Sequence, residues 1–131
     1  LFCGDTLFLA GCGRLFEGSA DQMQQAMDYF ASLPDSTEVY CTHEYSLANL
    51  AFAKAADPTN SEIDNATTQC EQLRADNKPT LPSNIGLERK INPYMRTRET
   101  ALIQSASQYK NKTLSAGVET LAALREWKNS F

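Results

Sequence analysis

The sequence contains one histidine among 131 residues, and its four cysteines form no C-x-x-C pair. It therefore lacks the closely spaced ligands of a zinc finger. No apolar run reaches the ~18 residues of a membrane-spanning helix, so we expect no membrane partner. The 12 Lys and Arg residues are outnumbered by 16 Asp and Glu residues. This acidic balance argues against nucleic acid as the main partner, because phosphate binding requires a basic face.

The composition is that of an ordinary folded protein, with 42% hydrophobic and 21% charged residues. A chain of this size can bury a core without metals or disulfides. We therefore expect free thiols in a reducing compartment, the cytoplasm. The chain opens at Leu1 inside a strand–turn–strand pattern over residues 1–10, which predicts a piece of a longer protein.

Up to about Tyr45, strand and helix patterns alternate. The apolar residues 7–10 predict a strand. A capping box at residues 19–22, with apolar residues at helical spacing behind it, predicts a helix that ends near Pro34. Residues 39–41 predict another strand. This order is typical of a layered α/β unit.

From about residue 46 onward the pattern is helical. It predicts one helix over residues 46–56 and a second that starts at a capping box formed by Thr59 and Glu62. Two more helices are predicted, over residues 97–109 and from about Ser115 to the end. An extended segment is expected at residues 77–82. In the last helix the residues expected to face inward are Val118, Leu121, Leu124 and Phe131. The change of pattern divides the chain into domains at 1–45 and 46–131.

Asp5 and His43 are the residues whose positions suggest chemistry. Each follows a predicted strand, and if those strands are neighbours the two side chains converge at one edge of a sheet. A carboxylate and an imidazole are ligands that zinc accepts. Two ligands do not complete a tetrahedral site, however. The residues alone leave a second interpretation open, in which Asp5 caps a turn and His43 bonds a backbone carbonyl.

Two basic residues near the end, Arg125 and Lys128, share one helical face because they are three positions apart. Such a pair suits a carboxylate ligand, although an ordinary solvated face would have the same pattern. Trp127 is more typical of packing than of binding. A nucleophilic Cys12 would need a basic or helix-start context, which the sequence does not provide.

Longer segments carry a resemblance to a known family. They are residues 1–8, 10–14, 16–18, 39–45, 49–50, 81–83, 92–96 and 124–131. In order and in spacing they resemble glyoxalase II, the hydroxyacylglutathione hydrolases of the metallo-β-lactamase superfamily. The resemblance covers essentially the whole chain.

The resemblance implies an α/β (α+β) fold. Residues 1–45 would form the C-terminal portion of a metallo-β-lactamase-like αββα sandwich, and residues 46–131 an all-helical glutathione-binding domain. Asp5 would bridge two divalent metal ions, zinc or else iron or manganese, and His43 would bind the second ion. Both residues would thereby be catalytic.

The same resemblance implies a set of residues that hold the glutathione part of the substrate. They are Arg14, Phe16, Tyr45, Arg125 and Lys128. Guanidinium and ammonium groups are matching donors for the carboxylates of glutathione. The family often has a tyrosine at the position of Phe16, so one phenolic hydrogen bond to the substrate is expected to be lost.

The implied activity is hydrolysis of S-2-hydroxyacyl-glutathione thioesters, chiefly S-D-lactoylglutathione, to D-lactate and glutathione, the second step of methylglyoxal detoxification. Hydroxide formed between two metal ions would attack the thioester carbonyl. The family's H-x-H-x-D-H motif precedes the segment that starts here. We therefore expect this chain to need the missing N-terminal half of the same fold as its partner and to be inactive alone. A non-catalytic module that binds glutathione thioesters, and an interaction domain that docks on another protein, are the alternatives.

Overall fold

The computed structural model describes residues 2–4, 6–13, 20–41 and 45–131. The elements in chain order are β1 (Phe2–Gly4), β2 (Leu7–Phe8), β3 (Gly11–Cys12), α1 (Ala20–Ala31), β4 (Glu38–Cys41), α2 (Ser46–Ala56), α3 (Ser61–Ala75), β5 (Ser83–Asn84), α4 (Ile85–Ile91), the 3-10 helix η1 (Pro93–Met95), α5 (Thr100–Lys110) and α6 (Val118–Ser130). Within these ranges no helix is both long and apolar enough to cross a membrane.

The strands form two small sheets. In one sheet β4 lies between β1, to which it is parallel, and β5, to which it is antiparallel. In the other sheet β2 and β3 form an antiparallel hairpin, which pairs Leu7 with Cys12 and Phe8 with Gly11. Strands and helices thus combine in one mixed fold, which confirms the predicted α/β (α+β) class.

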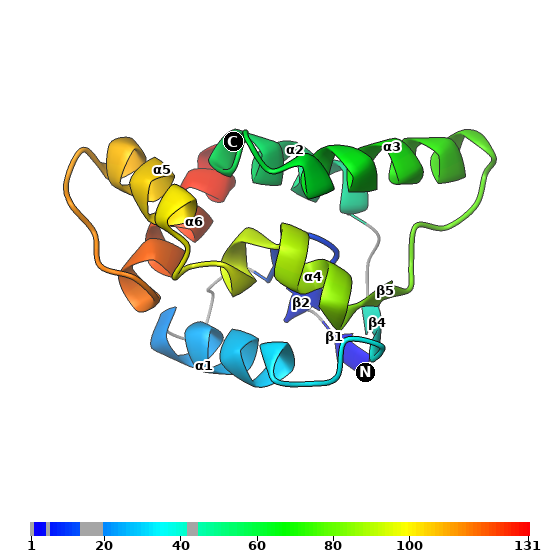
Figure 1. Cartoon of the computed structure of the whole chain (residues 1–131), viewed down its shortest axis with the longest axis horizontal. Helices are drawn as coiled ribbons and strands as arrows, with labels where there is room; N and C mark the ends of the chain where they lie inside the picture. Colours follow the sequence, from blue (N-terminus) through cyan, green and yellow to red (C-terminus); the bar gives the residue numbers. More distant parts are fainter. Residues whose placement is uncertain (1, 5, 14–19, 42–44) are drawn as a thin grey trace.

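The helices lie in tiers, as Figure 1 shows: α2 and α3 extend along the top, α4 and η1 cross the middle, and α1 lies at the bottom. The tiers touch one another, because α3 packs on α4, and α1 packs on both η1 and α6. Helices α5 and α6 pack together at one end of the molecule, and the β1–β4–β5 sheet lies toward the other end.

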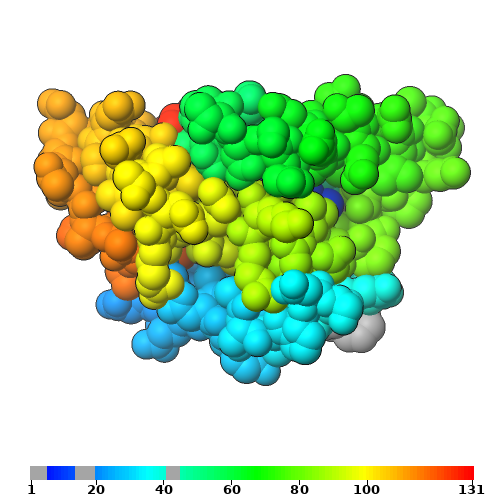
Figure 2. Space-filling view, in the orientation of Figure 1, coloured from blue at the N-terminus to red at the C-terminus, as the bar shows by residue number. Residues whose placement is uncertain are grey.

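The β2–β3 hairpin is enclosed between these tiers. Leu7 and Cys12 belong to a large buried cluster that includes Phe52 of α2. Leu9 and Ala10, at the hairpin turn, belong to a second buried cluster with side chains of α2, α3 and α4. On the face drawn in Figure 2, residues 6–13 show only as a small blue area between α3 and α4.

Several elements agree with the sequence predictions. Helix α2 spans residues 46–56 as expected and is capped by Asp57, next to Pro58. Strand β4 and helix α1 occupy their predicted regions, although the capping residue proposed for α1, Ser19, lies outside the described residues. Helix α3 follows its predicted start region and buries Ile63, Ala66 and Cys70.

The predicted continuous strand over residues 7–10 is wrong. Leu9 and Ala10 form a turn between two short strands, and Ala10 has the left-handed backbone conformation, with φ of 57°. Both turn residues are apolar because the turn packs into the core rather than into solvent. The apolar run therefore marked burial and not strand geometry.

The capping box expected at Thr59 is also wrong, because Asn60 caps α3. Its side-chain oxygen accepts a hydrogen bond from the Glu62 N–H at 3.1 Å. Its amide group donates to the backbone carbonyl of Lys90 and to the Asp57 carboxylate. Asn60 is preferred because one side chain satisfies the helix start and ties it to α2 and α4.

The last two helices begin later than predicted, at Thr100 and Val118. The segments before them are tied to other parts of the chain instead. The Thr97 hydroxyl donates to the Gln24 side chain at 2.8 Å, and the Thr97 carbonyl accepts from the Gly117 N–H at 3.1 Å. These tertiary bonds satisfy groups that a longer helix would have used.

Phe131 does not face inward as predicted, since 59% of it is exposed. It follows the last helical residue, and its ring meets that of the buried Phe52 in an edge-to-face arrangement, with centroids 5.4 Å apart. Helices α4 and η1 had no prediction at all. They lie in the region between the extended segment and α5.

Candidate functional site

The ends of strands β1 and β4 lie side by side. The two strands are parallel, and Gly4 at the end of β1 is paired with Cys41 at the end of β4. Asp5 follows Gly4 directly, and His43 comes two positions after Cys41. Both residues lie outside the described part of the chain. The register nevertheless shows that the strands that lead to them end at one edge of the sheet, as the prediction required.

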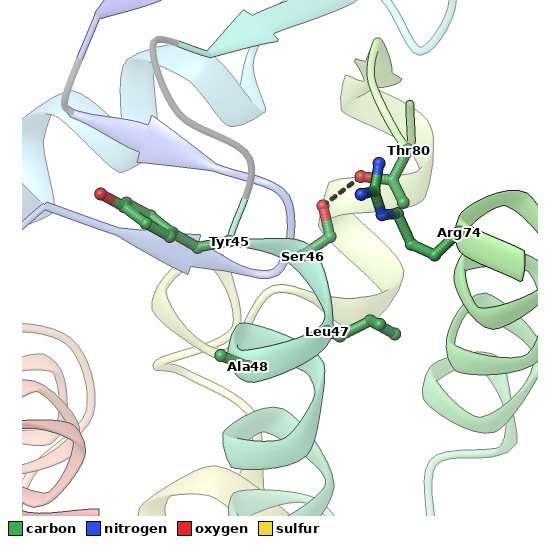
Figure 3. Close-up of a pocket in the computed structure, with 6 residues that line it drawn as sticks. All are labelled: Tyr45, Ser46, Leu47, Ala48, Arg74 and Thr80. Carbon is green, nitrogen blue, oxygen red and sulfur yellow. Dashed lines mark hydrogen bonds between the residues drawn. The ribbon is translucent and has the colours of Figure 1, made fainter. Parts of the chain in front are cut away.

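Tyr45 stands at the start of α2 and is 53% exposed. Its ring lies against that of Phe8 in β2, with centroids 5.6 Å apart. Figure 3 shows the Tyr45 ring directed away from Arg74 and Thr80, which lie on the other side of the helix start. Because about half of Tyr45 is exposed, its phenol can form a hydrogen bond with a ligand while its ring packs on the hairpin.

An open cleft of about 340 Å³ begins beside Tyr45. Its lining consists of Tyr45, Ser46, Leu47, Ala48, Arg74 and Thr80. At its base the buried hydroxyls of Ser46 and Thr80 are 2.6 Å apart, as drawn in Figure 3. Arg74, on α3, is exposed and reaches the Lys78 carbonyl at 3.4 Å. The cleft thus offers one exposed cation but not the Arg125 and Lys128 pair.

Arg125 is buried rather than displayed on a solvated face, with only 7% of it exposed. Its Nη1 donates to the backbone carbonyl of Cys12 at 2.7 Å, and its Nη2 donates to the Asn129 side chain at 3.1 Å. The guanidinium carbon lies 5.8 Å from the ring centroid of Tyr94. Its Nε has no hydrogen-bond partner in the described part of the chain. Arg125 therefore presents its charge at the end of β3.

Lys128 lies one turn further along α6 and is half-buried. Tyr45 and Arg125, from α2 and α6, thus both touch the β2–β3 hairpin, one through Phe8 and the other through Cys12. Arg14 and Phe16, which follow β3 in the sequence, lie outside the described residues. The structure brings Tyr45 and Arg125 to the element that leads to Arg14.

Cys12, Tyr94 and Arg125 share one buried environment. Burial raises the pKa of the Cys12 thiol to about 12, although the positive charge of Arg125 acts in the opposite direction. Burial also raises the pKa of the Tyr94 phenol far above its ordinary value. Both groups are therefore neutral near pH 7. A thiol with so high a pKa is a poor nucleophile, so Cys12 is unsuited to covalent catalysis.

The described residues hold no group of three or more His, Cys, Asp or Glu side chains that could bind a metal ion. The predicted ligands Asp5 and His43 are not among the residues searched. Their donor set, a carboxylate and an imidazole, does suit zinc, iron or manganese. Their role as metal ligands stays a prediction from the sequence.

Sequence reasoning gave no role to a set of polar side chains that bond the hairpin backbone. They are Asn49 of α2, Glu88 of α4 and Asn92 at the end of α4. A signal existed for Glu88, which lies between Ile85 and Ile91 at a spacing of three and so shares their buried face. A carboxylate on an apolar helix face indicates a specific buried partner.

Comparison with known proteins shows which family the chain resembles. Residues 44–131 match the family model described as hydroxyacylglutathione hydrolase C-terminus. Over all 131 residues the chain is 53% identical to a hydroxyacylglutathione hydrolase of Pseudomonas putida (strain GB-1) and 50% identical to one of Nitrosomonas europaea. It is 52% identical to one of Albidiferax ferrireducens. The chain spans about half the length of these relatives, 51%, 50% and 51%.

A family model that covers most of the chain and about 50% identity along its whole length confirm the resemblance found in the sequence. The matched range contains Tyr45, Arg125 and Lys128, and the described helices from α2 to α6. The chain therefore belongs to the hydroxyacylglutathione hydrolase family, glyoxalase II.

Proposed function

We propose that this chain is the C-terminal part of a thioester hydrolase that converts S-2-hydroxyacyl-glutathione, chiefly S-D-lactoylglutathione, to a 2-hydroxy acid and glutathione. The observation that carries the proposal is the parallel pairing of Gly4 with Cys41, which supports convergence of Asp5 and His43. The names of the relatives support the substrate class. In this proposal the enzyme acts in the cytoplasm, in agreement with the free thiols of Cys12 and Cys70.

Asp5 and His43 are the residues of this chain that would hold metal. Two divalent ions, when bound, supply an acidified water as nucleophile and a counter-charge for the developing oxyanion. The chain has one histidine, so further imidazole ligands must come from outside these 131 residues. Asp5 would act by setting the geometry of the metal pair rather than as a general base.

The proposed substrate-binding residues are Arg14, Phe16, Tyr45, Arg125 and Lys128, of which Tyr45 and Arg125 contact the β2–β3 hairpin. Lys128 and Arg14 would pair with glutathione carboxylates, and Tyr45 would bond the peptide part. The buried Arg125 places a positive charge beside the Cys12 carbonyl, two residues before Arg14. It would strengthen the attraction for an anionic ligand and orient the chain at the end of β3.

The test uses the purified full-length protein with S-D-lactoylglutathione. His43→Ala and Asp5→Asn should abolish turnover and lower the metal content, measured by elemental analysis. Lys128→Ala should raise KM with little change in kcat, because it removes binding rather than chemistry. Lys112→Ala, which removes an exposed lysine between α5 and α6, is the matched control and should leave both constants unchanged.

The 131-residue segment by itself should show no turnover, since it contains one histidine. Hydrolysis by that segment, proportional to its concentration and abolished by His43→Ala, would contradict the proposal. Binding of a non-hydrolysable glutathione thioester by the full-length protein without any turnover would favour the non-catalytic binding module. A complex with another protein that forms without metal or glutathione would favour the interaction domain.

A further inference from the structure

The β2–β3 hairpin is too short to hold its own shape. Each strand has two residues, and the turn between them includes Ala10 in the left-handed conformation, which favours glycine. A hairpin of this size is not stable by itself in water. Its backbone groups must therefore find partners elsewhere, because buried N–H and C=O groups are rarely left without one.

Those partners are side chains of the helices that surround the hairpin. The bonds run from Asn49 to the Leu9 carbonyl, from the Ala10 N–H to Glu88, from Asn92 to the Phe8 and Gly11 carbonyls, and from Arg125 to the Cys12 carbonyl. The helices that contribute are α2, α4 and α6. We call Asn49, Glu88 and Asn92 the hairpin clamp.

Glu88 is the centre of the clamp and is fully buried. Its Oε1 accepts from the Ala10 N–H and from the Asn92 amide, both at 2.9 Å. Its Oε2 accepts from the Ser83 hydroxyl. A carboxyl group in an apolar interior is unfavourable unless such donors compensate it, so its position is fixed by all three.

Asn92 is held in one orientation by the bonds at its two ends. Its Oδ1 accepts from the Tyr94 N–H at 2.9 Å and so caps η1. Its Nδ2 points at the Gly11 carbonyl at 3.0 Å and at Glu88. Because the start of η1 and the hairpin share this one side chain, a shift of either element would break bonds to the other.

Asn49 closes the clamp from the side of α2. Its Nδ2 donates to the Leu9 carbonyl at 3.2 Å. A Cβ atom at Gly11 would lie 2.7 Å from the same nitrogen, so only glycine leaves room for this contact. The backbone of β3 is thus pressed directly against the helix.

The base of the hairpin connects the clamp to the proposed site. The Gly13 N–H donates to the Thr6 carbonyl at 3.0 Å, which closes the hairpin below its paired strands. Thr6 is the neighbour of Asp5, and Gly13 is the neighbour of Arg14. The clamp therefore holds residues 8–11 of a hairpin whose base, the Thr6–Gly13 bond, joins the neighbours of a predicted metal ligand and of a predicted substrate-binding residue.

We propose that Glu88, together with Asn49 and Asn92, is a positioning residue for catalysis: from the helical part of the chain it fixes the hairpin whose two ends carry Asp5 and Arg14. This inference rests on the proposed function. Glu88 touches neither substrate nor metal and acts through the backbone of Ala10. Residues that orient the ligands of a site in this way affect metal affinity or activity by about 10- to 100-fold.

The test compares Glu88→Ala with Glu88→Gln in the purified full-length protein. Glutamine keeps an oxygen for the Ala10 N–H and the Asn92 amide, and its NH₂ can donate to the Ser83 hydroxyl. Glu88→Ala should lower kcat and metal affinity by about 10- to 100-fold, and Glu88→Gln should restore both. Amide hydrogen exchange of residues 6–13 should be faster in Glu88→Ala alone.

A matched control separates positioning from stability. Leu102→Ala removes a fully buried side chain of α5, a helix that contributes none of the side-chain hydrogen bonds to the hairpin backbone named above. It should lower the melting temperature but leave kcat, metal affinity and hairpin exchange unchanged at temperatures where the protein is folded. If Glu88→Ala does not fold, Asn49→Ala serves in its place. That variant removes one clamp bond and leaves the Glu88 carboxyl group with all three of its hydrogen-bond donors.

The inference is overturned if a folded Glu88→Ala or Asn49→Ala variant keeps wild-type metal affinity, kcat and hairpin exchange. It is also overturned if Leu102→Ala, at an equal loss of melting temperature, lowers metal affinity and kcat and speeds hairpin exchange as much as the clamp variant does. Failure of the proposed function has a different signature. In that case the wild-type protein itself would not hydrolyse the thioester.

Discussion

The Arg125 guanidinium donates a 2.7 Å hydrogen bond to the backbone carbonyl of Cys12, a residue that lies 113 positions earlier in the chain. The bond joins the last helix to the last residue of the hairpin. It makes Arg125 part of the interior, whereas the neighbouring Lys128 is only half-buried. Arg125 and Lys128, two of the basic residues predicted to bind glutathione, therefore differ in what they contribute to the folded state.

Replacement of Arg125 should separate these contributions. Arg125→Ala leaves the Cys12 carbonyl without its donor and removes the packing over Tyr94, so we expect a loss of about 2 to 4 kcal/mol in the free energy of unfolding. Lys128→Ala should cost less than about 1 kcal/mol. Urea unfolding of the purified protein measures both. Equal losses in the two variants would contradict the assigned burial of Arg125.

Glu88 should make the stability depend on pH. Burial raises its pKa from 4.5 to about 7, although its neutral partners, the Ser83 hydroxyl, the Asn92 amide and the Ala10 N–H, act in the opposite direction. An acid with a higher pKa in the folded state binds its proton more tightly when folded. Its protonation therefore favours folding at low pH, and that stabilisation is lost as the pH rises from 4.5 to about 7.

Glu88→Gln removes this titration and serves as the comparison. The unfolding free energy of the wild type, relative to Glu88→Gln, should fall between about pH 5 and about pH 7.5, by roughly 1.4 kcal/mol for each unit of pKa difference. Urea unfolding at both pH values gives the difference. Parallel behaviour of the two proteins would show that Glu88 has an ordinary pKa.

The Cys12 thiol should resist alkylation in the native protein. Burial and a pKa of about 12 leave almost no thiolate near neutral pH, and the thiolate is the reactive form. Treatment with iodoacetamide followed by peptide mass analysis should find Cys12 unmodified in the native protein and modified in urea. Native labelling of Cys12 at the rate of an exposed cysteine would be incompatible with the structure.

The aromatic cluster around Phe52 should dominate the stability of the helical part. The Phe52 ring is fully buried and meets Trp127 edge-on, with centroids 5.2 Å apart, and stacks on Tyr94 at 6.3 Å. Phe52→Ala should therefore cost about 3 to 5 kcal/mol. Phe131→Ala, which truncates a mostly exposed ring of the same cluster, should cost less than about 1 kcal/mol. Thermal unfolding would refute this order if Phe131→Ala were the more damaging change.

Helices with a clear apolar period and a strong stop signal could be predicted from the sequence. Helix α2 begins and ends as expected because Asp57 and Pro58 cannot continue it. The beginnings of α5 and α6 were misplaced because Thr97 is bonded to Gln24 of α1 and to Gly117, contacts that no local pattern contains. Helix α4 was missed because it is short, and the buried Glu88 interrupts the apolar face by which a helix is recognised.

The candidate site, like the helices, could be predicted from the sequence only in part. Motif spacing alone indicated the family and the candidate residues Asp5, His43, Tyr45, Arg125 and Lys128. Spacing could not show that Arg125 is buried, or that Asn49, Glu88 and Asn92 hold the hairpin. Those residues act on backbone groups up to 84 positions away, as between Asn92 and Phe8.

By itself, then, the sequence determined which family the chain belongs to, which residues are candidates for metal and substrate, and where the helices with regular apolar stripes lie. These properties are local, since they depend on residue types at short spacings. The parallel pairing of β1 with β4 and the enclosed hairpin of residues 7–12 depend instead on contacts between distant parts of the chain. The reason is physical: the short strands and the buried polar groups are stable only where distant side chains complete their hydrogen bonds.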